Sequence, residues 1–330
     1  MFILNANEPN ELTTYLQKQQ WLGLDEEIVS LTKPGEGNMN YVLRVTTEQR
    51  TFIVKQSRAY VEKYPQVAAP EKRVVTEGAF YKKISSEKTV QKFMPKLIGL
   101  DVANNVMVIE DLGNSNDFTF LYDEKHQLDE LELIELTAYL NQLHHSFQKA
   151  TIDDELENLE LRRLNHEHIF QYPFMEENGF DLNSVQHGLQ ELALPYKNNA
   201  ELKKQISTLG SLYLSKGQYL LHGDYYPGSW LKTADGIKII DPEFCYYGLR
   251  EFDLGVVLAH LHLTAQDEHL LSFVIREYKD YNELNSAILN GFIGVEIMRR
   301  LIGLAQLPLQ MDLTKKRQLL EFAKTLILNN

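Results

Sequence analysis

The segment from Tyr219 to Gly255 constrains the fold of this chain more than any other part of the sequence. It contains two short apolar strands, and an acidic residue follows the end of each one. Asp224 follows the first strand, with Ser229 five residues later, and Asp241 and Glu243 flank a proline after the second strand. Aspartates at strand ends commonly cap turns, which is the simplest interpretation of each residue taken alone. Four acidic or hydroxyl side chains at these spacings point instead to a site that handles charge.

The pattern suits the transfer of a phosphoryl group to a hydroxyl. Such a reaction has a loose transition state, so it needs a base beside the attacking hydroxyl and cations on the phosphate oxygens. We predict Asp224 as the base, and Asp241 with Glu243 as ligands of Mg²⁺. Side chains two residues apart share one face of a strand, so we expect extended backbone through Pro242. Ser229 stands where the catalytic loop of protein kinases places a second metal ligand, and we predict it as a weaker ligand.

A glycine-rich loop lies in the N-terminal part of the chain. Gly35 and Gly37 stand between a short strand and an alternating one, so the backbone there can close on phosphates with no side chain in the way. The loop resembles the kinase pattern G-x-G-x-x-G-x-V, with Asn40 in place of the third glycine. A hairpin turn that binds no ligand is the alternative interpretation.

The next apolar strand ends in Lys55. Kinases keep a lysine in this position, where it pairs the nucleotide phosphates with a glutamate on a helix. Glu77, in a helix expected from about Glu71 to Ile84, is the predicted partner of Lys55, and Glu71 and Glu62 are alternatives. A lysine at a strand edge facing water is the simpler interpretation.

A hairpin is expected from residues 97–101 and 106–109, and a connector follows it. Kinases bind adenine through the backbone of a connector in this place. We therefore predict that Glu110 and Leu112 supply the carbonyl and the amide of that contact.

Arg299 and Arg300 lie in the middle of an apolar helix. A charged pair in such a run must find partners or reach a cleft, since burying it unpaired is costly. A salt bridge within the acidic part of the chain and a contact with the substrate are the two interpretations.

Composition excludes several classes of protein. The chain has 330 residues and a net charge of −13, no apolar run of the roughly 18 residues that span a membrane, and no basic region at its start. Residues 1–110 carry 14 basic and 13 acidic residues, whereas the remainder carries 19 and 33, which suggests two lobes. We expect a cytoplasmic protein that binds neither nucleic acid nor membrane. The single cysteine, Cys245, is expected to be a buried filler.

The ordered segments GEGNMNYVLRV, FIVKQ, MVIEDL, LHGDYYPGS, KIIDPEF, FDLG and MRRLIGLA resemble the methylthioribose kinase family, within the aminoglycoside and choline phosphotransferases. The resemblance implies an α+β, two-lobed, protein-kinase-like fold, with a small antiparallel-sheet lobe over residues 1–112 and a larger, mainly helical lobe over residues 113–330. It implies ATP and Mg²⁺ as cofactors, and Asp253 as the brace of the catalytic loop. The roles carried over are Asp224 as base, Lys55 on the nucleotide phosphates, Asp241 and Glu243 on the metal, and Arg299 with Arg300 toward the sugar. Together with the residues predicted above, the expected nucleotide contacts are Gly35, Gly37, Asn38, Asn40, Lys55, Glu77, Glu110 and Leu112, and the expected metal ligands are Ser229, Asp241 and Glu243.

The sequence departs from the family at Tyr225, Tyr226 and Pro227, where the family usually has L-H-T. Both tyrosines are expected beside the attacking hydroxyl and are therefore predicted substrate contacts. The first candidate substrate is methylthioribose, with its 1-hydroxyl as acceptor, and the runner-up is an aminoglycoside, choline or another amino alcohol. A nucleotide-binding protein without catalysis is the alternative from another class. The oligomeric state stays open, with a homodimer as one option.

Overall fold

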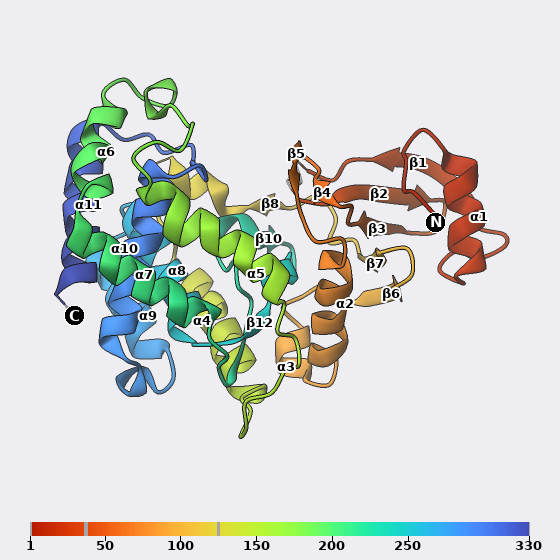
Figure 1. Cartoon of the computed structure of the whole chain (residues 1–330). Coiled ribbons are helices and arrows are strands. Elements are labelled where there is room, and N and C mark those ends of the chain that lie inside the picture. The colour runs from red at the N-terminus through yellow and green to blue at the C-terminus, as the bar shows by residue number, and fades with distance from the viewer. Residues whose placement is uncertain (1, 36–38, 124–125, 330) are drawn as a thin grey trace. The chain divides into compact units, whose positions relative to one another are not determined.

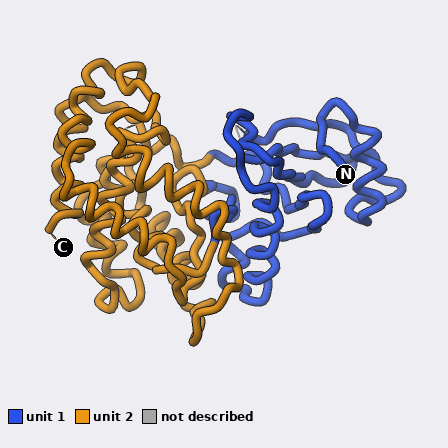
Figure 2. Tube along the Cα trace, viewed as in Figure 1, with its two compact units in different colours: residues 1–116, 231–245 blue, residues 117–230, 246–330 orange. Residues whose placement is uncertain are grey.

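The computed structural model describes residues 2–35, 39–123 and 126–329. The chain forms two compact units, and each of them is built from two segments of sequence (Figure 2). Unit 1 comprises residues 1–116 and 231–245, and unit 2 comprises residues 117–230 and 246–330. Two short strands, β8 (Asn116–Asp117) and β10 (Trp230–Thr233), lie where the chain passes from one unit to the other.

Unit 1 is organised by a five-stranded antiparallel sheet with the order β1-β2-β3-β7-β6 (Figure 1). The predicted hairpin of β6 and β7 is confirmed, and the predicted helix after Lys55 is α2. The strands and helices of unit 1 are α1 (Pro9–Lys18), β1 (Ile28–Thr32), β2 (Tyr41–Thr47), β3 (Thr51–Gln56), β4 (Tyr60–Val61), β5 (Tyr64–Ala68), α2 (Arg73–Ile84), α3 (Lys88–Gln91), β6 (Leu97–Asp101), β7 (Val106–Glu110), β11 (Gly236–Ile239) and the 3₁₀ turn η6 (Pro242–Phe244).

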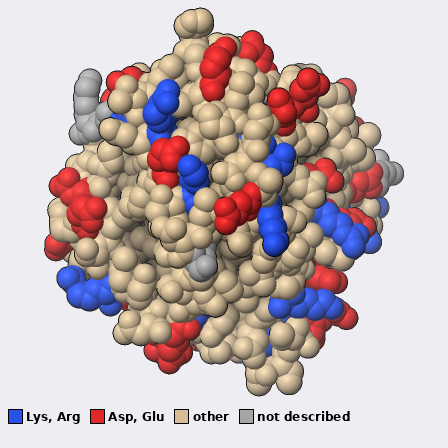
Figure 3. Space-filling model, turned by 60° about the vertical axis from the view of Figure 1, so that its left-hand side comes forward, with Lys and Arg blue, Asp and Glu red and all other residues tan. Residues whose placement is uncertain are grey.

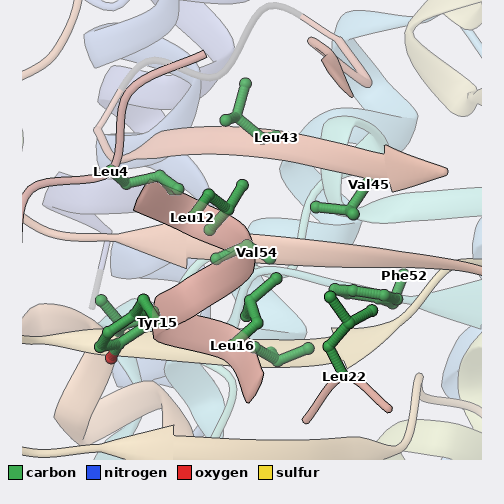
Figure 4. Close-up of a cluster of buried hydrophobic side chains, with 11 residues drawn as sticks. Leu4, Leu12, Tyr15, Leu16, Leu22, Leu43, Val45, Phe52 and Val54 are labelled. Atoms are coloured by element: carbon green, nitrogen blue, oxygen red, sulfur yellow. The ribbon is translucent and has the colours of Figure 1, made fainter. Parts of the chain in front are cut away.

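One face of this sheet forms a hydrophobic core with α1. Side chains from α1, such as Leu12 and Leu16, point toward those of β2 and β3, such as Val45 and Phe52 (Figure 4). Successive side chains of a strand alternate between faces, so Phe52 and Val54 enter this core while Lys55 lies on the opposite face. The alternation of β3 therefore presents Lys55 to the side of the sheet away from α1.

The segment of residues 231–245 belongs to unit 1, although it lies far along the chain. We expected a single boundary after residue 112, with this segment in the C-terminal lobe. The structure differs because η6 packs against α2, and the Ile239 N–H donates to the carbonyl of Phe93 at 2.6 Å. Cys245, which ends the segment, is fully buried, as expected for a filler.

Unit 2 is mainly helical and contains one small antiparallel pair, β9 with β12. Helix α8 is apolar on nearly all sides, and α10 packs against both α8 and α11. The helices and strands of unit 2 are η1 (Phe118–Tyr122), α4 (Glu130–Ser146), α5 (Leu159–His166), η2 (Glu167–Gln171), η3 (Tyr172–Phe174), η4 (Leu182–Ser184), α6 (Leu189–Lys197), α7 (Ala200–Leu214), β9 (Tyr219–Leu221), η5 (Pro227–Ser229), β12 (Tyr246–Gly248), α8 (Glu251–Leu263), α9 (Glu268–Glu277), η7 (Tyr281–Glu283), α10 (Ser286–Ile302) and α11 (Leu313–Leu328).

The predicted α+β class is confirmed, with an antiparallel sheet in the N-terminal part and mainly helices after it. None of the helices within the described residues is both long and apolar enough to cross a membrane. On the face drawn in Figure 3, basic side chains lie among acidic ones and form no continuous stripe.

Candidate active site

In unit 1, Lys55 lies between two carboxylates. Its Nζ is 2.9 Å from Glu77 Oε1 and also forms a close ion pair with Asp241 Oδ1. The predicted partner Glu77 therefore does pair with Lys55, whereas the alternative Glu62 pairs with Arg58. Burial works against the charge on Lys55, but Asp241 and Glu77 outweigh it and hold its pKa above the ordinary value.

The backbone around Asp241 and Glu243 differs from the prediction. We expected extended geometry through Pro242, but Asp241 has φ 61° and ψ 50°, and residues 242–244 form the turn η6. Aspartate is one of the few residues other than glycine that adopt this left-handed conformation readily. The two carboxylates are therefore brought near Lys55 by a tight turn and not by a shared strand face.

Glu243 is held by Asn40 and Arg73. The Asn40 amide donates to Glu243 Oε2 at 3.0 Å, Arg73 Nη2 donates to the amide oxygen of Asn40 at 3.0 Å, and Arg73 Nε lies 3.7 Å from Glu243 Oε2. The amide nitrogen and the amide oxygen of Asn40 are therefore both hydrogen-bonded to other side chains. Burial, with the charge of Glu77 as the next contribution, raises the pKa of Glu243 to about 8.

These residues make up the lysine–carboxylate cluster, which we define as Lys55, Arg73, Glu77, Asp241 and Glu243. It brings three carboxylates together with two cationic side chains. Glu77 Oε2 is buried and has no hydrogen-bond partner among the described residues, while the Asp241 side chain is 46% exposed. Among the described residues, no group of three or more His, Cys, Asp or Glu side chains is arranged to hold a metal ion, so the roles of Asp241 and Glu243 as Mg²⁺ ligands stay predictions.

The other predicted nucleotide contacts of unit 1 are backbone positions. Gly35 is exposed, and a Cβ added there would meet no atom within 4 Å. Gly37 and Asn38 lie outside the described residues. The Glu110 N–H donates to the Lys96 carbonyl at 2.9 Å, and the contact of the Glu110 carbonyl with adenine stays a prediction. Leu112 lies just after β7 and is half-buried.

In unit 2, Asp253 holds the loop of residues 222–229 through hydrogen bonds to its backbone. This fully buried aspartate accepts from the N–H of His222 at 2.7 Å and from that of Gly223 at 3.0 Å. Gly223 has φ 84°, a conformation that side chains disfavour. His144 Nε2 lies 3.2 Å from the same carboxylate, so the loop is held to both α8 and α4. These contacts agree with the bracing role that the family resemblance implies for Asp253.

Two residues of this loop have local structural contacts. The Ser229 hydroxyl donates to the Asp224 carbonyl at 2.9 Å, which folds the loop on itself, and its role as a metal ligand stays a prediction. Tyr225 is fully buried, stacks on Tyr139 and donates its hydroxyl to the Leu136 carbonyl at 3.0 Å. The prediction that Tyr225 contacts the substrate is wrong, because its ring and its hydroxyl are both used in the core of unit 2.

Asp224 is one of the partly exposed residues of the loop, with a side chain that is 27% exposed. The Nη2 atoms of Arg299 and Arg300 each lie 3.8 Å from its Oδ1. Burial raises the pKa of Asp224 above its ordinary value, although Arg300 and Arg299 oppose the shift. Tyr226 lies beside this group, because the Arg300 guanidinium sits 4.8 Å from the centre of its ring.

Both arginines also pair with Glu296, one turn earlier on α10. Arg299 Nε is 2.6 Å from Glu296 Oε2, and Arg300 Nε donates to Glu296 Oε1 at 2.7 Å. We define Asp224, Glu296, Arg299 and Arg300 as the arginine–aspartate cluster. The two interpretations of the arginine pair are therefore compatible, since one carboxylate anchors the pair while its outer nitrogens face Asp224.

Three residues in or next to these clusters were not predicted from the sequence, namely Glu296, Arg73 and His260. Glu296 precedes the arginines by three and four residues, a spacing at which helical side chains meet, so it was open to prediction. Arg73 pairs with Glu243, which lies 170 residues away, so no local spacing indicates it. His260, which contacts Glu296 at 3.1 Å, carried no such signal, because its partner is 36 residues away.

Comparison with known proteins gives matches over part and over most of the chain. Residues 161–285 match the phosphotransferase enzyme family. Methylthioribose kinase of Exiguobacterium sibiricum is 28% identical over 334 residues, which cover 88% of this chain and 84% of that relative.

Solved structures share the fold at low sequence identity. Spectinomycin phosphotransferase, in complex with ADP and spectinomycin, has a TM-score of 0.54 and 14% identity, with 96% of this chain and 97% of that chain covered. Choline kinase from Streptococcus pneumoniae has a TM-score of 0.52 and 11% identity, with 98% and 100% covered. The predicted kinase-like phosphotransferase fold is confirmed.

Proposed function

We propose that this chain, which is similar to the phosphotransferase enzyme family and to methylthioribose kinases, transfers the γ-phosphoryl group of ATP to a hydroxyl of a small polyhydroxylated molecule. Methylthioribose, phosphorylated on its 1-hydroxyl, is the first candidate. The observation that carries the proposal is Asp224, a partly exposed carboxylate on a braced loop with two guanidinium groups beside it. A cytoplasmic location and a homodimer stay predictions.

In the proposed reaction, the acceptor oxygen forms a bond to the γ-phosphorus while the bond from that phosphorus to its bridging oxygen breaks. The products are ADP and a phosphate ester. Asp224 accepts the proton of the attacking hydroxyl, and its raised pKa makes it a better proton acceptor than an ordinary aspartate. The proton then leaves to solvent as the product departs.

The residues of unit 1 bind the nucleotide in this proposal. Lys55, oriented by Glu77, pairs with phosphate oxygens, and the glycine loop supplies backbone N–H groups. Glu110 and Leu112 offer their backbone to the adenine. Because both ends of the Asn40 amide are occupied, we assign Asn40 to holding Glu243 and not to a direct phosphate contact.

Asp241 and Glu243 are the residues that would hold Mg²⁺. When bound, the ion neutralises charge on the phosphate oxygens. The fit rests on the acidic excess of the lysine–carboxylate cluster and on the raised pKa of Glu243, which a nearby divalent cation would lower again. Lys55, which pairs with Asp241 in this structure, would pair with the nucleotide phosphates.

The acceptor is better matched by a neutral sugar than by a cationic amine. In the arginine–aspartate cluster, two guanidinium groups face two carboxylates, so the cluster offers no surplus of negative charge to an ammonium group. Discrimination against a partner often comes from such unfavourable charge. This observation favours methylthioribose over an aminoglycoside or choline, which remain the second candidate.

An acceptor screen tests the proposal. ADP release would be followed with ATP, Mg²⁺ and, in turn, methylthioribose, an aminoglycoside, choline and an amino alcohol, and the product would be identified by mass spectrometry. We expect one ADP per phosphorylated sugar and the highest kcat/KM for methylthioribose. ADP release with the amines alone would favour the second candidate, and nucleotide binding without ADP release would indicate a protein that only binds nucleotide.

A further inference from the structure

Glu296 contacts both arginines of the arginine–aspartate cluster. Its side chain is 3% exposed, and each of its two carboxylate oxygens lies against the Nε of a different arginine, at 2.6 Å for Arg299 and 2.7 Å for Arg300. Residues three and four positions apart share one face of a helix, so α10 itself supplies this arrangement. The Arg300 contact is a hydrogen bond, and the Arg299 contact is an ion pair without hydrogen-bond geometry. One carboxylate therefore contacts the inner edges of two guanidinium groups.

The outer edges of the same groups face the proposed base. With each Nε paired with Glu296, both Nη2 atoms lie at the same distance of 3.8 Å from Asp224 Oδ1. An arginine side chain has many rotamers, and a binding group that is held in place before the ligand arrives binds it with a smaller loss of entropy. Glu296 thus determines where the two cationic groups stand.

A second layer orients Glu296 in turn. His260 Nε2 lies 3.1 Å from Glu296 Oε1, and His260 Nδ1 lies 2.9 Å from the hydroxyl of Tyr122. One tautomer satisfies both contacts, with Nε2–H donating to Glu296 and Nδ1 accepting from the tyrosine. Burial lowers the pKa of His260 to about 4, so the ring orients the carboxylate without adding a charge.

We propose that Glu296, oriented by His260 and Tyr122, is a positioning residue that presents Arg299 and Arg300 to the hydroxyl-bearing acceptor and thereby sets the affinity for it. This inference rests on the proposed kinase function. It deepens that function by naming a residue that touches neither the nucleotide nor the reacting atoms.

The test is a split between kinetic constants in Glu296→Gln, measured with the full chain. A glutamine keeps one acceptor oxygen but turns an NH₂ group toward the second arginine, which then leaves its place. We expect the KM for methylthioribose to rise about tenfold or more, while kcat falls less than about threefold, since misplaced positioning groups cost binding on this scale. The dissociation constant for ATP, measured by calorimetry, is expected to stay unchanged.

Two further variants separate positioning from general damage. Glu321→Gln, on α11, removes a carboxylate that also accepts from a tyrosine hydroxyl but lies outside the cluster, and it is expected to leave both KM values unchanged. Tyr122→Phe keeps the ion pairs and removes only the outermost hydrogen bond, so a smaller rise in the acceptor KM is expected. It also serves as the readout if Glu296→Gln does not fold. An unchanged acceptor KM in Tyr122→Phe and in any folded Glu296→Gln would overturn the inference, as would an equal loss of ATP affinity.

Calorimetry with methylthioribose alone keeps this result distinct from that of the proposed function. A wild-type protein that binds the sugar but releases no ADP contradicts the kinase proposal, and the effect of Glu296→Gln on sugar affinity still decides the positioning role. A wild-type protein that binds none of the screened acceptors contradicts both.

Discussion

Two charged clusters, one in each unit, balance their charges differently. In the lysine–carboxylate cluster of unit 1, three carboxylates surround two cations, and the pKa of Glu243 is raised to about 8. In the arginine–aspartate cluster of unit 2, two carboxylates meet two guanidinium groups. Although burial works against it, the arginines hold the pKa of Glu296 well below its usual range.

The difference in charge balance suggests what each cluster binds. The first cluster has one more carboxylate than cationic side chains, and one of its carboxylates, that of Asp241, is 46% exposed, so we propose that a further cation binds there. The second is complete with its own residues and offers directed N–H donors, which suit the hydroxyl groups of a neutral acceptor. The comparison therefore assigns metal and nucleotide to unit 1 and the acceptor to unit 2, and the following predictions test that assignment.

The largest expected effect follows from replacing Lys55, because its loss increases the acidic excess of unit 1. Lys55→Met should lower the free energy of unfolding by about 3–5 kcal/mol, the usual cost of leaving a buried charge without its partner. Urea unfolding would measure it. The double variant Lys55→Met with Glu77→Gln should recover part of the loss, and equal stability of the single variant and the wild type would contradict the charge assignment.

The pH dependence of stability should reflect His260 in unit 2. Its pKa in the folded protein is about 4, below the 6.5 of an exposed histidine, because burial keeps it neutral among Glu296, Arg299, Arg300 and Tyr122. As the pH falls from 6.5 to 4, the unfolded chain takes up a proton that the folded chain does not, so stability is lost in that window, by up to about 3 kcal/mol. The wild type should lose more stability there than His260→Asn, and parallel curves would contradict this.

Loss of the proposed base should act on turnover alone. Asp224→Asn is expected to lower kcat by roughly a hundredfold or more, the scale for losing a positioned base, and to leave ATP affinity unchanged. Asp267→Asn removes an exposed carboxylate of unit 2 and serves as the control. Unchanged turnover in Asp224→Asn would remove this residue from the mechanism.

Removal of a proposed metal ligand should act on the metal requirement. Asp241→Asn is expected to raise the Mg²⁺ concentration that gives half-maximal activity by about tenfold, in the range seen when the surroundings of a metal site are altered. Titration of Mg²⁺ at saturating ATP would measure it. An unaltered requirement would move the ligand role to other residues and weaken the contrast between the clusters.

The sequence was sufficient for the parts of both clusters that depend on local spacing. Strand alternation and the order of acidic residues are local patterns, whereas the Lys55–Glu77 pair was predicted from the kinase pattern and the antiparallel-sheet lobe from the family resemblance. The contacts that join distant segments could not be predicted from local spacing. Examples are His260 with Glu296 and Asn40 with Glu243. The turn at Asp241 was missed because proline only disfavours helix in the residue before it, and left-handed backbone is a rarer outcome than extended backbone.

The smallest expected effect concerns Tyr225, whose burial in unit 2 was not apparent from the sequence. Tyr225→Phe removes the hydrogen bond to the Leu136 carbonyl and leaves the ring stacked on Tyr139. It should lower the free energy of unfolding by about 1 kcal/mol, the usual net contribution of one hydrogen bond, without changing the acceptor KM. The matched variant Tyr226→Leu replaces the ring that contacts Arg300 and should instead raise the acceptor KM. Equal effects of the two variants on KM would return Tyr225 to the substrate contacts and would show that the acceptor reaches deeper into unit 2 than the arginine–aspartate cluster.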